Sequence, residues 1–241
     1  MMPRMRSAIL TYHSLDLSGS VISTAPRLFA RQMEWLASSG IRVVPLASVR
    51  EIAGAVAVTF DDGYRNFISH AWPVLRQYGF PATIFVVSGY CGRTNEWSSQ
   101  GRWFPRLPLM DWEELRELSR ERIEIGAHSV NHDNLSRLEP RRAVAELRGS
   151  RASIEDEIGT PVRAFAYPYG ASTPEVRELA RREFAFCCGT RLAFTDRDSD
   201  PANLPRLDVF YLRRMFWWSH LMDSWGGAYV ACRRLLRDIR P

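Results

Sequence analysis

Two adjacent carboxylates stand at the end of an apolar run in the first third of the chain. Asp61 and Asp62 follow residues 55–60, which are small, β-branched or aromatic, and Gly63 comes next. Adjacent carboxylates repel each other, and burial penalises the charged form of each. An ordinary buried strand would not end in this way, so the pair marks a candidate functional site.

Two histidines at the end of another apolar run extend this candidate site. His128 and His132 follow residues 123–127, and in a helical turn a spacing of four places both imidazoles on one side. Alone, such a pair is more often a surface or core feature than a metal site. Here two of only five histidines lie at one strand end and a carboxylate pair lies at another. Two His and one carboxylate form a common catalytic metal set, which favours the metal site.

A third polar turn has the sequence FAYPYG at residues 165–170. Pro168 and Gly170 restrict its backbone, and such a turn can point the amide N–H of Tyr169 at a developing oxyanion. A plain tight turn is the alternative, and it would be preferred if this motif stood alone.

The elements that must position these residues alternate between strands and helices. This alternation predicts a parallel sheet, and seven or eight such units in 241 residues suit a β/α barrel better than an open sheet. In both architectures active sites gather at the carboxyl ends of the strands. The expected strands are residues 8–12, 42–45, 55–60, 82–87, 123–127, 162–166, 184–188 and 207–211. The expected helices are a segment between Thr24 and Gly40 and residues 66–78, 112–120, 139–158 and 174–182.

The loop of residues 88–110 lacks periodicity, and a loop this long inside a compact domain is often functional. Its Trp97, Trp103 and Phe104 can stack on sugar rings of a substrate. An equally weighted alternative is that these side chains cover one end of the barrel.

Composition and charge bound the fold and the function. The chain is 46% hydrophobic and has no linker-like or low-complexity run, which favours one domain over residues 1–241. All 32 basic residues are arginine, so a Schiff-base lysine and a phosphate-loop lysine are excluded. The net charge is +5, of which +4 falls on residues 201–241. The near-neutral remainder argues against a nucleic-acid-binding protein.

Both ends of the sequence bear on location. The N-terminal apolar run, residues 8–10, is too short for a signal peptide or a membrane span, and four cysteines without CxxC spacing suit a reducing compartment. We therefore expect a cytoplasmic protein. Residues 210–241 combine Phe and Trp residues with six arginines, which suits peripheral contact with a membrane interface. The slightly favoured alternative is a helix that packs on the barrel with solvated arginines.

Taken together, the three motifs resemble those of the polysaccharide deacetylases of carbohydrate esterase family 4, which share the NodB-homology fold. The chain has TFDDG at residues 59–63, HSVNH at 128–132 and AYPYG at 166–170, where the family has TFDDG, H-S/T-x-x-H and R-x-x-P-Y. The resemblance covers nearly the whole chain and implies a distorted (β/α) barrel of about seven strands.

The resemblance also implies a role for each site residue. Asp62, His128 and His132 would bind one divalent metal ion, often zinc, and Asp61 would be the general base for the attacking water. The amide of Tyr169 would stabilise the tetrahedral oxyanion. The metal would neutralise Asp62, which explains how two carboxylates can share one strand end.

The chain departs from the family pattern at two points. Ala166 stands where the family has an arginine that holds the base, and Arg206, which borders the last expected strand, is the candidate to replace it. The family's late L-x-H motif, which supplies an acid, is also missing, and His220 lies in an unlike context. Some relatives are circular permutants whose N-terminal strand, reading Y-H, takes the place of the last one. This chain resembles those, so we expect His13 to be the general acid.

These features predict a metal-dependent N-deacetylase that acts on an N-acetylated sugar in a polysaccharide, oligosaccharide or lipid-linked glycan. Two alternatives stay open. One is a catalytically inactive carbohydrate-binding or scaffold protein on the same fold, and bound metal would argue against it. The other is a deformylase or amidase that acts on a small non-sugar amide, and a comparison of substrates would separate it.

Overall fold

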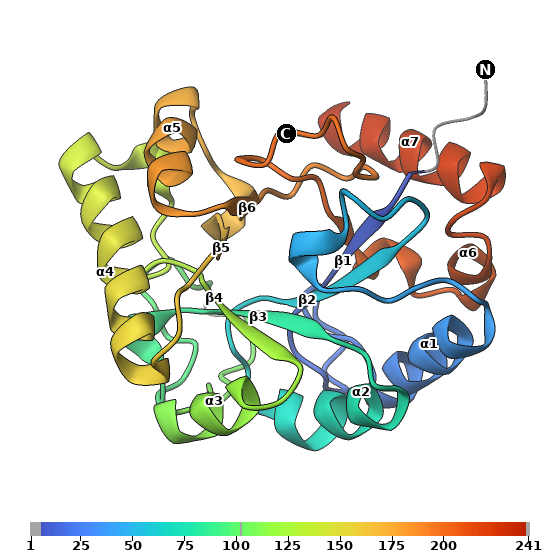
Figure 1. Ribbon diagram of the computed structural model, residues 1–241, viewed down its shortest axis with the longest axis horizontal. Coiled ribbons are helices and arrows are strands. Elements are labelled where there is room, and N and C mark those ends of the chain that lie inside the picture. Colours follow the sequence, from blue (N-terminus) through green and yellow to red (C-terminus); the bar gives the residue numbers. More distant parts are fainter. Residues whose placement is uncertain (1–5, 102, 240–241) are drawn as a thin grey trace.

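The computed structural model describes residues 6–101 and 103–239, and within them seven strands form one parallel sheet. Across the sheet the strands follow the order β6-β5-β4-β3-β2-β1-β7. The sheet curls into a half-barrel, and the helices lie around its outside (Figure 1). This single α/β domain confirms the predicted distorted barrel.

The strands are β1 (Ala8–Tyr12), β2 (Val56–Phe60), β3 (Ala82–Val86), β4 (Ile123–Ala127), β5 (Ala164–Ala166), β6 (Phe186–Cys188) and β7 (Leu207–Asp208). The α-helices are α1 (Pro26–Ser38), α2 (Trp72–Tyr78), α3 (Trp112–Ser119), α4 (Pro140–Ile158), α5 (Pro174–Glu183), α6 (Met215–Ser219) and α7 (Ser224–Ile239).

Although β1 is first in the chain, it lies inside the sheet between β2 and β7. Both β1 and β2 are buried along their whole length, as is typical of parallel strands covered on both faces. Tyr12 at the end of β1 lies opposite Phe60 at the end of β2. His13 and Asp61, the next residue of each strand, therefore leave the sheet side by side at its carboxyl edge.

An aromatic cluster anchors these two strand ends. The rings of Tyr12 and Phe60 stack with centroids 5.2 Å apart, and Phe29 of α1 packs edge-on against both at 5.1 and 5.7 Å. Phe67 packs edge-on against Phe60 at 4.8 Å. Large buried aromatic rings contribute strongly to core stability, so this cluster fixes the position of the polar residues that follow.

Two of the expected strands are wrong in extent. Residues 42–45 form only a bridge, with Val43 opposite Val56, because Pro45 has no N–H with which to continue a ladder. The last expected strand, residues 207–211, ends at Asp208. The carboxylate of Asp208 accepts a hydrogen bond from the Phe210 amide at 2.9 Å, and the chain turns there. The other six expected strands form, with ends shifted by at most two residues.

Local signals place the helices close to the expected ranges. Asp111 forms a capping box at the start of α3, and Gly159 ends α4 in the left-handed region, with φ at 77°. Thr24 is not the cap of α1, because Ala25 holds that position and Pro26 opens the helix. The expected helix of residues 66–78 is divided into a π-helical stretch, Phe67–Ala71, and α2.

Candidate active site

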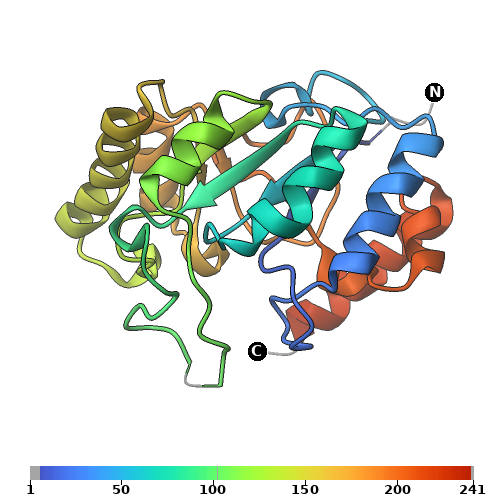
Figure 2. The same ribbon diagram turned by 90° about the horizontal axis from the view of Figure 1, so that it is seen from below.

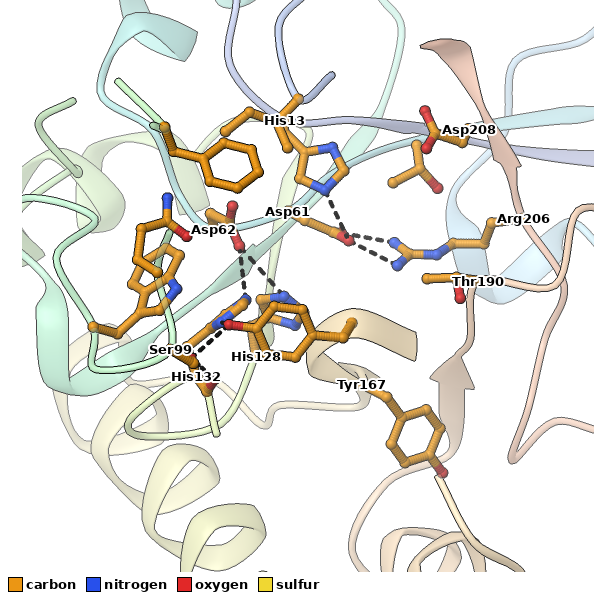
Figure 3. A pocket seen from close by; sticks show the side chains of 16 residues that line it. His13, Asp61, Asp62, Ser99, His128, His132, Tyr167, Thr190, Arg206 and Asp208 are labelled. Atoms are coloured by element: carbon orange, nitrogen blue, oxygen red, sulfur yellow. Dashed lines mark hydrogen bonds and ion pairs between the residues drawn. The ribbon is translucent and has the colours of Figure 1, made fainter. Parts of the chain in front are cut away.

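A cavity opens at the carboxyl ends of the strands, and residues from all three sequence motifs line it (Figure 3). His13 follows β1, Asp61 and Asp62 follow β2, and His128 follows β4. The parallel sheet brings these residues together because its strands end along one edge. The cavity is lined by Thr11, His13, Ile22, Asp61, Asp62, Trp97, Ser99, Gln100, Phe104, His128, His132, Tyr167, Tyr169, Thr190, Arg206 and Asp208.

Asp62, His128 and His132 gather around a single point. One ligand atom of each lies within 4.8 Å of those of the other two. Asp62 Oδ1 is 3.4 Å from His128 Nε2 and 3.3 Å from His132 Nε2. Ligand atoms about 2.0–2.2 Å from one cation are about 2.8–3.6 Å apart when their bonds are tetrahedral or at right angles. The three side chains therefore fit one divalent cation and leave coordination positions open for water or substrate.

Contacts on the far side of each imidazole orient both rings for metal binding. His128 Nδ1 lies 2.7 Å from the carbonyl oxygen of Ala166, and His132 Nδ1 lies 3.0 Å from Tyr169 Oη. A hydrogen bond from Nδ1–H fixes the tautomer that leaves Nε2 free to bind a metal. The indole of Trp97 also stacks on the His132 ring, with centroids 4.2 Å apart.

The charge states of two of the three ligands, Asp62 and His132, suit cation binding. Burial raises the pKa of Asp62, but hydrogen bonds from His128 and His132 lower it more, so the pKa lies well below the usual range of aspartate. Burial lowers the pKa of His132 and favours the neutral imidazole. A carboxylate and a neutral imidazole are the forms that bind metals.

Backbone strain among the described residues gathers in these same segments. Four residues other than glycine have a positive φ, namely Asp62 at 71°, Ser129 at 65°, His132 at 58° and Tyr169 at 61°. Such conformations are uncommon for L-residues and persist only where the surrounding structure determines them, often at functional sites. All four lie within the three motifs, so the fold maintains an unfavourable backbone to shape this cavity.

Asp61 stays outside the metal-binding set because Arg206 holds it. The guanidinium forms two parallel hydrogen bonds of 2.7 Å to the Asp61 carboxylate, and its Nε donates to the Gly189 carbonyl oxygen at 2.9 Å. Burial raises the pKa of Asp61, but the charge and hydrogen bonds of Arg206 together with the charges of His128 and His13 lower it more, so the pKa is lower than usual. The structure thus places the Arg206 guanidinium on Asp61, the residue that the sequence analysis expected this arginine to hold. Its role in catalysis stays a prediction.

His13 joins the two metal-binding histidines in this cavity. Its Nε2 lies 3.9 Å from Asp61 Oδ2, and its side chain is 23% exposed. His220 does not line the cavity and instead places its Nδ1 2.8 Å from the carbonyl oxygen of Phe216. His70 is exposed and lies in a different groove.

Tyr169 contributes both its backbone and its side chain. In the described part of the chain, its amide N–H has no backbone acceptor, as an oxyanion donor requires. Its hydroxyl lies 2.6 Å from Ser99 Oγ as well as near His132. The sequence analysis expected the amide and did not anticipate that the side chain would support a metal ligand.

The aromatic residues of the long loop differ from expectation. Trp97 is only 3% exposed and packs on His132, so it supports the metal site from within the cavity lining. Trp103 is 85% exposed but lies outside the cavity lining, whereas Phe104 belongs to it. This loop projects from the body of the protein (Figure 2), and some of its side chains line the cavity. Phe104 is therefore better placed than either tryptophan to contact a bound sugar.

Sequence analysis missed Glu146, which controls the turn between the two metal-binding histidines. Glu146 is 4% exposed on α4, and its Oε2 accepts hydrogen bonds of 2.9 Å from the amides of Val130 and Asn131. Its Oε1 accepts a third, of 2.6 Å, from Asn131 Nδ2. The only signal in the sequence is a glutamate on the apolar face of an amphipathic helix. Its partner could not be read from that pattern.

Replacing Glu146 with alanine is expected to weaken metal binding by about 10–100-fold, the usual effect of losing a group that orients metal ligands. The change leaves two buried amides without an acceptor and frees the turn that spaces His128 and His132. Glu146→Gln keeps an acceptor oxygen and should be milder. The measurement is the dissociation constant of the metal by competition with a chelating dye. Glu139→Ala, an exposed position beside the same helix, is the control. Equal affinity in Glu146→Ala and Glu139→Ala would contradict this role.

Comparison with known proteins agrees with this geometry. Residues 49–183 match the family profile described as polysaccharide deacetylase. The chain is 25% identical over 182 residues to YxkH of Bacillus subtilis, in an alignment covering 72% of this chain and 60% of that protein. It is 22% identical over 225 residues to a poly-beta-1,6-N-acetyl-D-glucosamine N-deacetylase of Staphylococcus aureus, covering 85% of this chain and 72% of the relative.

Two solved structures share the fold. IcaB from Ammonifex degensii superposes with a TM-score of 0.74 at 24% identity, over 93% of this chain and 97% of its own. The Streptococcus pyogenes deacetylase PplD, solved in complex with acetate, superposes with a TM-score of 0.73 at 20% identity, over 86% of this chain and 93% of its own. At these identities the likeness supports the architecture, and residue roles must come from the site itself.

Proposed function

Because the chain belongs to the polysaccharide deacetylase family, we propose that it is a metal-dependent hydrolase that removes the acetyl group from an N-acetylated sugar. The substrate would be a polysaccharide, an oligosaccharide or a lipid-linked glycan. One observation carries the proposal. Asp62, His128 and His132 form a metal-binding set, while Asp61 beside them is kept free of it by Arg206. A metal site with an adjacent unliganded base is what amide hydrolysis needs.

The residues present fit one divalent cation, for which we propose Zn²⁺, held by Asp62, His128 and His132. Such a cation supplies a Lewis acid that polarises a carbonyl and lowers the pKa of water from about 15.7 toward about 7.

Residues of the chain then carry out the two proton transfers and stabilise the oxyanion. Asp61 accepts a proton from the water that adds to the acetyl carbonyl carbon, and Arg206 keeps its carboxylate ionised and oriented. The amide N–H of Tyr169 donates to the oxyanion of the tetrahedral intermediate. His13 donates a proton to the sugar nitrogen as the C–N bond breaks, which yields acetate and a free amine.

We also propose that the chain is a circularly permuted member of its family. The position of β1 supports this proposal, because a strand from the start of the chain lies between β2 and β7 and delivers His13 to the cavity. No histidine from the C-terminal part of the described chain reaches the same cavity.

His13→Ala is therefore expected to lower kcat by about 10²–10³ while keeping the metal. The loss should stay below the upper limit for a proton donor, since His13 is partly exposed and water can partly replace it. The measurement is kcat on one sugar substrate together with metal content. His220→Ala, outside the cavity, should change kcat little. If His220→Ala strongly lowers kcat and His13→Ala does not, the proposed circular permutation is wrong.

The test of the proposed function is acetate release from N-acetylglucosamine oligomers by the metal-loaded protein. The name of the Staphylococcus aureus relative supports this sugar. The same assay on formylated and acetylated small amines separates a sugar deacetylase from a general amidase. Turnover of the small amides with none of the sugars would favour the amidase. Oligomer binding without any turnover would favour an inactive binding protein.

We further propose a cytoplasmic location with peripheral membrane contact through the C-terminal segment. In the described ranges, no helix combines the length and apolarity needed to cross a bilayer. Helix α7 exposes Trp225, Leu235, Leu236 and Ile239 and carries Arg233, a composition that suits an interface. The expected result is sedimentation with anionic vesicles at low salt and release as salt rises. A protein that stays in the supernatant at low salt would rule out this contact.

A further inference from the structure

A second cavity, which we call the arginine pocket, lies between the end of the sheet and helix α7. Its volume is about 330 Å³. Three of its seven lining residues are arginines, and none is acidic. The pocket is lined by Phe210, Tyr211, Arg213, Arg214, Trp217, Tyr229 and Arg233.

The charge of this pocket is not compensated within the described residues. Arg213 donates to two carbonyl oxygens, those of Ser20 at 2.7 Å and Ser23 at 2.5 Å. The Arg233 guanidinium donates from Nε to Tyr229 Oη at 3.2 Å and lies 5.5 Å from the centre of that ring. Carbonyl and aromatic partners position a guanidinium without cancelling its charge. Arg213 and Arg233 are thus positioned with their charge intact, and with Arg214 in the same lining they suit an anion.

The arginine pocket borders the catalytic cavity. Phe210 lies two residues after Asp208, which lines the catalytic cavity, so the two residues are at most about 7 Å apart along the chain. Arg213 binds the segment of residues 20–23, whose Ile22 also lines the catalytic cavity. The two cavities are therefore lined by neighbouring segments of the chain.

We propose that the arginine pocket binds a phosphate ester, next to the sugar that is deacetylated. Only the position of the phosphate next to a deacetylated sugar rests on the proposed function, and the binding of the phosphate ester does not. The planar guanidinium group matches the geometry of the phosphate oxygens. Three guanidinium groups offer more hydrogen-bond donors than one carboxylate can accept. Trp217 and Tyr229 stack with centroids 4.1 Å apart and form an apolar wall for the carbon side of the ester. The phosphate could belong to the substrate or to a phospholipid headgroup.

The first test is binding of glucose 1-phosphate, which has no acetyl group, to the full metal-loaded protein by calorimetry. Arg214→Gln and Arg233→Gln, both at exposed positions, should each weaken binding about tenfold or more. Arg141→Gln makes the same charge change on α4, on the opposite side of the molecule, and should have no effect (Figure 1). Equal binding by all three variants, or no binding to the wild type, would overturn the proposal. The result does not depend on activity, so it can fail while the deacetylase assignment stands.

The second test identifies the source of the phosphate. If the ester belongs to the substrate, kcat/KM for N-acetylglucosamine 1-phosphate should fall about tenfold in Arg233→Gln, while kcat/KM for neutral oligomers stays unchanged. If it belongs to a lipid, the same variant should instead lose binding to phosphatidylglycerol vesicles. Either result supports the phosphate site. If Arg233→Gln keeps both its kcat/KM for N-acetylglucosamine 1-phosphate and its binding to phosphatidylglycerol vesicles, the phosphate site is wrong.

Discussion

His132→Ala is expected to remove the bound metal and to reduce deacetylation to background. The change deletes one of three protein ligands and the imidazole that lies 3.3 Å from Asp62 Oδ1. Two remaining ligands hold a divalent cation weakly, and without the cation the cavity has no Lewis acid to lower the pKa of water toward neutrality. Asp62→Ala and His128→Ala should behave in the same way. The measurements are metal content after dialysis, with about one ion per chain expected in the wild type, and acetate release.

The control for this prediction is His70→Ala, which removes an exposed imidazole far from the metal set and should leave metal content and activity unchanged. Chelation of the wild type should abolish acetate release, and added Zn²⁺ should restore it. Full activity in a metal-free preparation would refute the metal mechanism altogether.

The parts of the site that the sequence predicted are those that local pattern and sheet architecture determine together. Asp61, Asp62 and His128 each follow an apolar run, and parallel strands bring such positions to one edge without knowledge of any side-chain contact. The same reasoning placed His13 at the edge where Asp61 and His128 lie, and the structure makes it a neighbour of Asp61 because β1 and β2 pair in register.

The parts that the sequence did not predict depend on contacts between distant segments. Glu146 on α4 reaches a turn 16 residues earlier, and a carboxylate at its position would read equally well as a solvated helix residue. Trp97 reads as an exposed loop residue until the fold of the loop brings its indole onto His132. Arg206 could be named only as a candidate, since 145 residues separate it from Asp61. The loop conformations and helix orientations that create these contacts leave no periodic signal.

Asp61→Asn is expected to keep the metal and to lower kcat by about 10⁴. The amide has nearly the shape of the carboxylate but cannot accept a proton, and Asp61 is not part of the metal-binding set. The substitution also leaves Arg206 buried without its counter-ion, so the free energy of unfolding should fall by about 3–5 kcal/mol. The measurements are kcat, metal content and urea unfolding. Loss of metal from this variant would show that Asp61 is a ligand and not the base.

Arg206→Gln removes the cation that pairs with Asp61 and leaves the Asp61 carboxyl group in place. In the wild type burial raises the pKa of Asp61, but Arg206 and the nearby His128 and His13 together lower it more, so the base stays ionised in acid. The stability from this pairing is present above the ordinary aspartate pKa of about 3.9 and is lost as the pH falls through the lower folded value. Without Arg206 the effect of burial remains, and the pKa of Asp61 must rise. The acidic limb of kcat/KM should therefore move to higher pH while the alkaline limb stays in place. A uniform loss at every pH, with the acidic limb unmoved, would mean that Arg206 only anchors the strand ends and does not tune the base.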